Sequence, residues 1–360
     1  MARRVRRAMG EGGRQAAKRR GRGGQGGRAR RRAGRRLTAV ALTCGPVIAA
    51  IDSCAVPRSA EGGIMGTTSS TPVAETITLR EIEPGDIEQC ARICFEAFGG
   101  IDDHHRFPPD FPSVEFASGM MQGFVGLPST WGVVAEVEGR IVGSNFIHQG
   151  DPIGGVGPIS VDPKHQGGGV GRKLMEAVIE RGRGAPGIRL LQDSFNMLSL
   201  SLYASLGFQE REPAVVMGGK PTSPPVEGIE VRQVREADLA GCEALCKKVH
   251  GFERTNELRG AMQAFAPYVA VRDDRVSAYA TALTFWPMAH GVAESDQDMQ
   301  ALLRGVAAAV DDPLAILVPL RSGLFHWCLS EGFRSLKPMN LMTLGAYQEP
   351  RGSWFPSVLY

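Results

Sequence analysis

The chain has 360 residues, of which 43% are hydrophobic and 22% charged, a composition typical of a soluble protein with room for two domains. Its net charge of +3 is the sum of a strongly basic segment and an acidic remainder. Residues 1–36 hold fourteen Arg and one Lys against one Glu, a net charge of +14, whereas the remaining 26 basic and 37 acidic residues give −11. Because an acidic body is repelled by phosphate backbones, nucleic-acid binding is disfavoured as the main function.

Residues 1–75 lack the pattern of a folded domain, and we interpret them as a basic extension that is disordered or misassigned. The apolar stretch 37–51 is too short, and too interrupted by Gly45 and Pro46, to span a membrane. Its basic start and apolar middle have the outline of an export signal, and an Arg/Gly-rich tail is also able to contact nucleic acid. Translation from Met65 would instead give a protein without this extension. We expect a cytoplasmic protein with no membrane partner.

Strands and helices alternate from residue 76 onward. We expect a strand over 76–82, a helix over 86–98, a loop over 100–113, a helix over 114–125, and a hairpin of strands 131–137 and 140–148. The loop places His104 and His105 beside Asp102 and Asp103, residue types that bind metals. We favour an acceptor contact or a surface position for them, and we expect no metal.

A glycine-rich loop follows the next expected strand, over 154–161. It reads Gln166-Gly167-Gly168-Gly169-Val170-Gly171-Arg172 and opens a helical pattern that continues through Leu174 and Val178. The first turn of a helix has unpaired N–H groups and the positive end of the helix dipole, and glycines let the backbone approach an anion closely. The loop lacks both the Lys-Ser/Thr ending of a P-loop and the G-x-G-x-x-G order of dinucleotide folds. The pattern therefore predicts a phosphate site of another kind.

Two ordered motifs carry a resemblance to a known family. The loop reads Q-x-x-G-x-G, and residues 196–208 are similar to N-x-x-A-x-x-x-Y-x-x-x-G-F, with Ser199 in the place of the small residue and a short strand near 187–193 between the motifs. Together they resemble the GNAT superfamily of acyltransferases. The resemblance implies a three-layer α/β (α+β) fold with a central mixed sheet.

The same resemblance implies acetyl-CoA as the co-substrate and assigns roles to residues. Tyr203 is the expected general acid for the CoA thiolate. The backbone of the strand before the loop is expected to pair with the pantetheine arm and to polarise the thioester carbonyl. The expected cofactor-binding residues are Ile159, Ser160, Val161, Gln166, Gly167, Gly168, Gly169, Val170, Gly171, Arg172 and Asn196.

The general base is left open by the sequence. Many members of the family carry a Glu on the strand before the loop, where this chain has Gly154, Gly155 and Gly157. The candidates are His148, Asp151 and Asp193, and direct attack by an amine that loses its proton through water is equally consistent with the residues.

The chain also repeats itself. Residues 79–98 and 231–250 align at a constant offset of 152, which matches Arg80 with Arg232, Asp86 with Asp238, Cys90 with Cys242 and Cys94 with Cys246. Because both copies have the Cys pair on one helix face, we interpret the cysteines as small buried residues and each Asp as a helix N-cap.

The second copy lacks the chemistry of the first. At an offset of 125, Tyr203 is replaced by Cys328 and Asn196 by Arg321, and an acidic segment, 290–298, stands where the glycine loop belongs. We therefore expect two tandem copies of the fold, of which the second is degenerate. The predicted divisions are an extension over 1–75, a catalytic domain over 76–219, a linker over 220–228, a degenerate domain over 229–347 and a tail over 348–360.

The main hypothesis is an acetyl-CoA-dependent N-acyltransferase acting on a primary amine of a small molecule or peptide, with a homodimer as one expected state. Two alternatives remain: a non-catalytic acetyl-CoA sensor or scaffold, and a nucleic-acid-binding protein that uses the Arg/Gly tail. Retention of Tyr203 favours catalysis over the sensor.

Overall fold

The computed structural model describes residues 76–359, which belong to one compact unit. The predictions for residues 1–75 therefore lie outside the described part of the chain. Within the described part, no helix is both long and apolar enough to cross a membrane.

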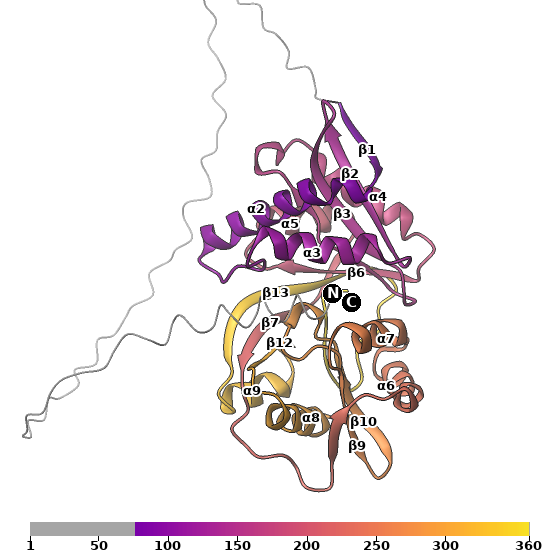
Figure 1. Ribbon diagram of the computed structural model, residues 1–360, viewed down its shortest axis with the longest axis vertical. Helices are drawn as coiled ribbons and strands as arrows, with labels where there is room; N and C mark the ends of the chain where they lie inside the picture. The colour runs from indigo at the N-terminus through magenta and orange to yellow at the C-terminus, as the bar shows by residue number, and fades with distance from the viewer. Residues whose placement is uncertain (1–75, 360) are drawn as a thin grey trace, which may run out of the picture. The chain divides into compact units, whose positions relative to one another are not determined.

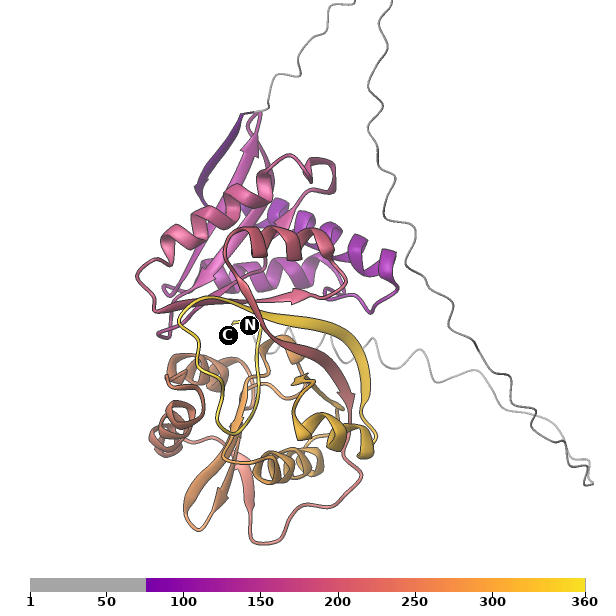
Figure 2. The ribbon, with the colours of Figure 1, turned by 180° about the vertical axis from the view of Figure 1, so that it is seen from behind.

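The first copy of the fold alternates strands and helices as the sequence predicts (Figure 1). Helices α2 and α3 cover one face of its strands and α4 and α5 the other, as the two opposite views show (Figure 2), which makes three layers. Its elements are β1 (Ile77–Glu81), α2 (Ile87–His105), α3 (Val114–Val125), β2 (Thr130–Val137), β3 (Arg140–His148), β4 (Gly154–Val156), β5 (Ser160–Val161), α4 (Val170–Arg181), β6 (Gly187–Asp193), α5 (Met197–Ser205) and β7 (Gln209–Gly219).

The second copy repeats this order and omits the counterpart of β5. One further short strand, at its C-terminal end, has no counterpart in the first copy. Its elements are β8 (Glu230–Gln233), α6 (Leu239–His250), α7 (Thr255–Ala264), β9 (Tyr268–Arg272), β10 (Arg275–Ala280), β11 (Gly291–Ala293), α8 (Asp296–Ala309), β12 (Leu314–Pro319), α9 (Gly323–Ser330), β13 (Arg334–Gly345) and β14 (Ser353–Phe355).

The two copies exchange their last strands. The larger sheet has the order β1-β2-β3-β4-β6-β13-β7-β12, with β5 paired to β3, and the smaller sheet has the order β14-β11-β10-β9-β8. Strand β13 of the second copy thus pairs antiparallel with β6 of the first, and β7 of the first copy pairs with β12 of the second (Figure 1). The predicted division into a domain over 76–219 and another over 229–347 stays a prediction, and neither repeat forms its sheet alone.

The hydrophobic cores show the same exchange. Met342 and Leu344 of β13 pack into the core between the first sheet and α4, while Val215 and Met217 of β7 pack into the core of the second copy. Burying such side chains contributes about 1.5–3 kcal/mol each, so separating the copies would expose apolar surface on both. We conclude that the repeats stabilise each other.

The repeated Arg and Asp form one ion pair in each copy. Nη1 of Arg80 lies 2.6 Å from Oδ2 of Asp86, and Nη1 of Arg232 lies 2.6 Å from Oδ2 of Asp238. Each Asp also accepts a backbone N–H three residues earlier, but neither side chain caps its helix. The predicted N-cap position of both Asp residues is confirmed, whereas the capping hydrogen bond is not formed, because the guanidinium engages both carboxylate oxygens. The predicted burial of the four repeated cysteines is confirmed.

Three predicted boundaries differ from the structure. Helix α2 continues past Gly99 and Gly100 to His105, because its last turn buries Asp102. The strand expected over 154–161 is interrupted between β4 and β5. Residues 348–360 were expected as a tail, yet β14 pairs with β11 and buries Phe355 in the second core, so this segment is part of the fold.

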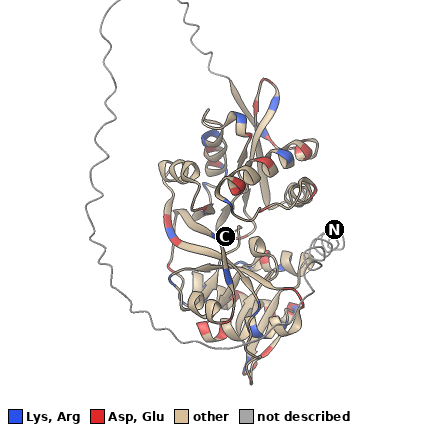
Figure 3. Cartoon of the chain, turned by 90° about the vertical axis from the view of Figure 1, so that its left-hand side faces the viewer, with Lys and Arg blue, Asp and Glu red and all other residues tan. Residues whose placement is uncertain are grey.

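Lys and Arg residues are interspersed with Asp and Glu residues along the described chain (Figure 3). One charged residue, Glu331, anchors the linker. Glu331, at the end of α9, accepts hydrogen bonds from the backbone N–H groups of Thr222 and Ser223, at 3.0 and 2.9 Å, and pairs with Arg304. The first residues of the predicted linker over 220–228 are thus hydrogen-bonded to the second copy.

Candidate active site

The glycine loop leads into α4 with backbone geometry that other residues rarely adopt. Gly167 has a φ of 82° and Gly169 a φ of 89°, both in the left-handed region that favours glycine. Gly169 is the N-cap of α4, and no side chain within the described range caps this helix. The first N–H groups of α4 therefore face an open loop, where they are able to bind an anion.

The side chains that border the loop are held by the protein itself. Gln166 donates a hydrogen bond from Nε2 to the Val161 carbonyl at 3.2 Å, which fixes the loop to the end of β5. Arg172 donates to Oγ of Ser205 at 2.6 Å and lies 3.9 Å from Glu176. Arg172 remains half-exposed beside the loop, so its positive charge is available to a ligand there.

The strand before the loop has one open edge. Strand β4 pairs with β6 in parallel at only two positions, where Gly154 lies opposite Ile188 and Gly155 opposite Arg189. Beyond this point β5 pairs with β3 alone among the described strands, through Ser160 and Val161. The two middle strands therefore separate next to the glycine loop, and one edge of β5 has no strand partner among the described residues.

Tyr203 is buried on α5, on the same side of the sheet as α4. Burial raises the pKa of its phenol, and the nearby charge of Asp193 raises it further. The phenol consequently keeps its proton at neutral pH, as a proton donor must.

Asn196 has a structural role that the sequence did not reveal. Its side-chain oxygen accepts a hydrogen bond from the backbone N–H of Ser199 at 3.2 Å, which caps α5. Its carbonyl accepts a hydrogen bond from Gln192. A contact to the cofactor, as the resemblance implies, stays a prediction for this residue.

Two of the three candidate bases have their acceptor atoms occupied. His148 is buried, which lowers its pKa to about 4, and its ring nitrogens lie 2.9 Å from Oγ1 of Thr130 and 3.0 Å from the Gly157 carbonyl. Both carboxylate oxygens of Asp151 accept backbone N–H groups at the start of α7, from Asn256 and Glu257 at 3.0 Å.

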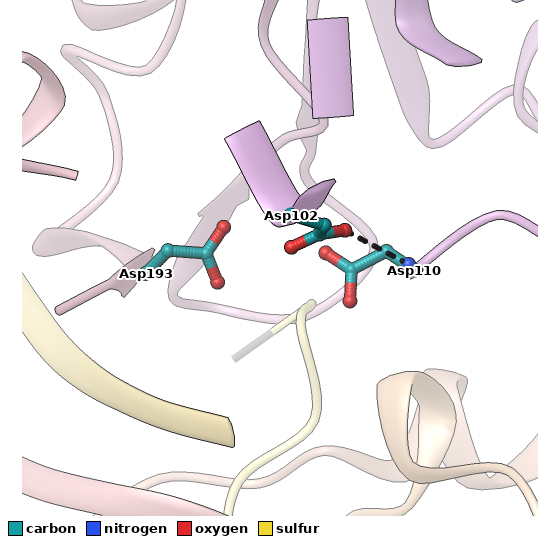
Figure 4. Close-up of side chains that lie close together, drawn as sticks. All are labelled: Asp102, Asp110 and Asp193. Atoms are coloured by element: carbon teal, nitrogen blue, oxygen red, sulfur yellow. Dashed lines mark hydrogen bonds between the residues drawn. The ribbon is translucent and has the colours of Figure 1, made fainter. Parts of the chain in front are cut away.

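The third candidate, Asp193, lies in a cluster that sequence analysis missed. Its carboxylate and those of Asp102 and Asp110 point toward one another (Figure 4), with oxygens within 4.8 Å. Nζ of Lys337, from β13 of the second copy, lies 3.0 Å from Asp193, 3.0 Å from Asp102 and 2.7 Å from Asp110. The ammonium group occupies the place that a cation would take among these carboxylates.

Burial controls the protonation of this cluster. It raises the pKa of Asp110 and of Asp193, and the attraction of Lys337 offsets this only in part. The pKa of Lys337 is also raised, because the three carboxylates outweigh the effect of its burial. No local signal joins these residues, since 235 positions separate Lys337 from Asp102.

Aromatic residues line the rim of the cluster. The ring of Phe195 stacks on Phe107 at 4.4 Å and lies 5.0 Å from the ring of His105, and Nζ of Lys337 lies 5.4 Å from the Phe195 centroid. The His- and Phe-rich segment singled out in the sequence therefore borders the end of β6. His104 packs on His105 and is exposed.

The corresponding place in the second copy is filled. Ser295 caps α8 by accepting the N–H of Asp298, so this helix start differs from that of α4. Strands β11 and β12 do not pair, and β14 lies along β11 instead. A Cβ at Gly291 would overlap the ring of Phe355, which shows how closely β14 packs.

A cavity of about 520 Å³ lies elsewhere in the first copy. Its lining includes Leu127, Trp131 and Arg181. Because Arg181 ends α4, this cavity is at the opposite end of the helix from the glycine loop, and it has no part in the site described above.

Comparison with known proteins gives the family. The sequence model described as "Acetyltransferase (GNAT) domain" matches residues 129–210, which contain both motifs. The chain is 31% identical over 146 residues to the N-alpha-acetyltransferase RimI of Mycobacterium tuberculosis, which covers 39% of this chain and 82% of that protein. The chain belongs to the GNAT family of acetyltransferases. Members of this family are enzymes that transfer acyl groups other than aminoacyl groups.

Other relatives match shorter parts of their own length. A mycothiol acetyltransferase of Thermomonospora curvata is 43% identical over 79 residues, which is 21% of this chain and 26% of that protein. Another, from a Nocardioides species, is 28% identical over 153 residues, which is 38% of this chain and 50% of that protein. The chain thus spans half or less of these two proteins.

The fold is shared with a solved structure. A putative acetyltransferase from Pyrococcus horikoshii aligns with a TM-score of 0.62 and 18% identity, over 79% of this chain and 95% of that protein. This likeness extends across both copies and confirms the predicted α/β fold with a central mixed sheet.

Proposed function

We propose that the first copy transfers the acetyl group of acetyl-CoA to a primary amine of a small molecule or peptide. The observation that carries the proposal is the uncapped start of α4 next to the open edge of β5, with Tyr203 buried on the same side of the sheet. These are the parts that a pyrophosphate, a pantetheine arm and a leaving thiolate require.

Each group has a role in this proposal. The amides of Gly168 and its neighbours, with Arg172, bind the pyrophosphate. The open backbone of Ser160 and Val161 binds the pantetheine arm and polarises the thioester carbonyl. The amine attacks that carbonyl directly, and the thiolate that leaves takes the proton of the Tyr203 phenol.

The second copy supports the first without binding acetyl-CoA in this proposal. Its helix start is capped by Ser295, its counterpart of Tyr203 is Cys328, and β14 occupies the gap beside β11. Equivalent backbone hydrogen bonds support the alignment of Tyr203 with Cys328. The N–H of Phe208 donates to the Tyr203 carbonyl, and the N–H of Phe333 donates to the Cys328 carbonyl.

Only the names of relatives indicate which class of amine accepts the acetyl group. One is an N-alpha-acetyltransferase and others are mycothiol acetyltransferases. A peptide α-amine and a small-molecule amine are therefore the two acceptors to test first.

A thiol-release assay with acetyl-CoA and these amines tests the proposal. Tyr203→Phe removes one hydroxyl, so turnover should fall by ~100- to 10,000-fold while acetyl-CoA affinity stays within a few-fold. Cys328→Ala is the matched control and should change turnover little. No thiol release from the wild-type protein with any amine, or a crippled Cys328→Ala beside an unaffected Tyr203→Phe, would contradict the proposal.

A further inference from the structure

One of the glycines on the strand before the loop leaves no room for a side chain. A Cβ at Gly155 on β4 would overlap the backbone of Leu359, so no acidic side chain fits at that position. The proton of the acceptor amine must go elsewhere, and His148 and Asp151 already use their acceptor atoms in hydrogen bonds.

Asp193 lies on the same face of the sheet as Gly155. Gly155 pairs with Arg189, and Asp193 follows Arg189 by four residues on β6, so the three residues share one face. Tyr203 lies on the opposite face, in the core that the sheet forms with α4. A group in the gap between β5 and β6 would thus have Tyr203 on one side and Asp193 on the other.

We propose that Asp193 accepts the proton of the acceptor amine, and that Lys337 of the second copy is the residue that positions Asp193 for this step. The inference rests on the proposed function of the first copy. It makes the active site of one copy incomplete without the strand supplied by the other.

The charges of the cluster suit this role. One ammonium, that of Lys337, lies among three carboxylates, so acidic groups outnumber the basic group in the cluster. Asp102 is fully buried, while Asp110 and Asp193 keep 12% and 8% of their side chains exposed. Of the three, Asp193 stands on the strand that borders the gap.

The proton balance is complete. The ammonium of the acceptor gives one proton to the Asp193 carboxylate, and the neutral amine forms the C–N bond. The C–S bond breaks, and the thiolate takes the proton of Tyr203. Of the two protons left on the attacking nitrogen, one returns to the phenolate and the other stays in the amide, and the Asp193 proton passes to water.

Asp193→Asn tests this step with little change of shape. We expect kcat/KM at pH 7 to fall by ~100-fold or more, with the affinity for acetyl-CoA unchanged. The loss should shrink at higher pH, and earlier for a peptide α-amine, with a pKa of about 8, than for an alkylamine, with a pKa of about 10.4. An amine that is already neutral needs no base.

Asp102→Asn is the matched control, because it removes a carboxylate bound to the same ammonium. The charge of Asp102 raises the pKa of Asp193. Without it, the acidic limb of the kcat/KM profile should move to lower pH while the plateau is kept. Lys337→Met should move the limb to higher pH, since Lys337 lowers the pKa of Asp193, and Lys337→Arg should restore it.

Two results would overturn the inference. One is a folded Asp193→Asn protein with wild-type kcat/KM and an unchanged limb. The other is an Asp102→Asn protein in which the acidic limb of the kcat/KM profile does not move. This second result decides the question if Asp193→Asn does not fold. Either result in an enzyme that releases thiol from acetyl-CoA leaves the proposed function intact, whereas an inactive wild-type protein refutes the proposed function first.

Discussion

Gly168→Glu places a negative charge in the glycine loop without straining it. Among the three glycines in a row, Gly167 and Gly169 have positive φ values, so a side chain there would strain the backbone. Gly168 does not, and a Cβ added to it would meet only the His165 carbonyl at 3.6 Å, an ordinary contact. A loss of binding in this variant therefore reports on charge and volume in the loop.

The expected loss follows from Coulomb's law. With an effective dielectric constant of about 40, a carboxylate about 5 Å from one phosphate charge and about 7 Å from a second costs ~3 kcal/mol, which corresponds to ~100-fold in Kd. Part of this effect should disappear at high salt, because the loop is exposed to solvent.

Calorimetry with acetyl-CoA measures the effect, and two variants control for it. Gly168→Ala adds only the Cβ and should stay within a few-fold of the wild-type Kd. Gly184→Glu adds the same charge past the other end of α4, where nothing lies within 4 Å of a Cβ, and should bind normally. If folded Gly168→Glu protein binds acetyl-CoA with unchanged affinity at low salt, the assignment of the phosphate site to this loop is wrong.

Two further predictions concern stability. Phe355→Ala should lower the free energy of unfolding by ~3–5 kcal/mol, because Phe355 is fully buried in the second core. Denaturant unfolding measures this loss, and Val358→Ala, at a half-buried position, is the control. A loss below ~1 kcal/mol for Phe355→Ala would mean that the fold does not depend on β14. Burial raises the pKa of Glu331, but hydrogen bonds from Ser223 and Thr222 outweigh it and lower the pKa to about 2. The ionised carboxylate therefore stabilises the fold fully above about pH 4.5, and this contribution is lost as the pH falls toward 2. Glu331→Gln should lower the free energy of unfolding at pH 7 by ~1–3 kcal/mol and should flatten the dependence of the melting temperature on pH between about 4.5 and 2. Glu349→Gln, at an exposed position, should match the wild type. An unchanged pH dependence for Glu331→Gln would contradict the proposed role of the Glu331 carboxylate.

The sequence by itself determined the features that depend on local spacing. The glycine loop, the start of α4 at Val170 and the helix of Tyr203 follow from residue types at fixed intervals, and the structure has them where they were expected. The repeat was equally readable, because matched residues such as Arg80 and Arg232 form the same ion pair in both copies. Periodicity and turn residues encode these features within about 20 positions.

Only the tertiary structure decided the contacts between distant strands. A strand's own pattern gives the face that it buries and not the strand beside which it lies, so the placement of β13 between β6 and β7 had no sequence signal. That placement carries Lys337 to Asp193 and Asp102. It also explains why α2 passes Gly99 and Gly100, whose cost of ~1 kcal/mol each is outweighed by the contacts of its last turn. The residues of the glycine loop are neighbours in the sequence, so the sequence alone predicts their chemistry. The acid cluster forms only because the two repeats exchange strands, so the sequence alone does not predict it.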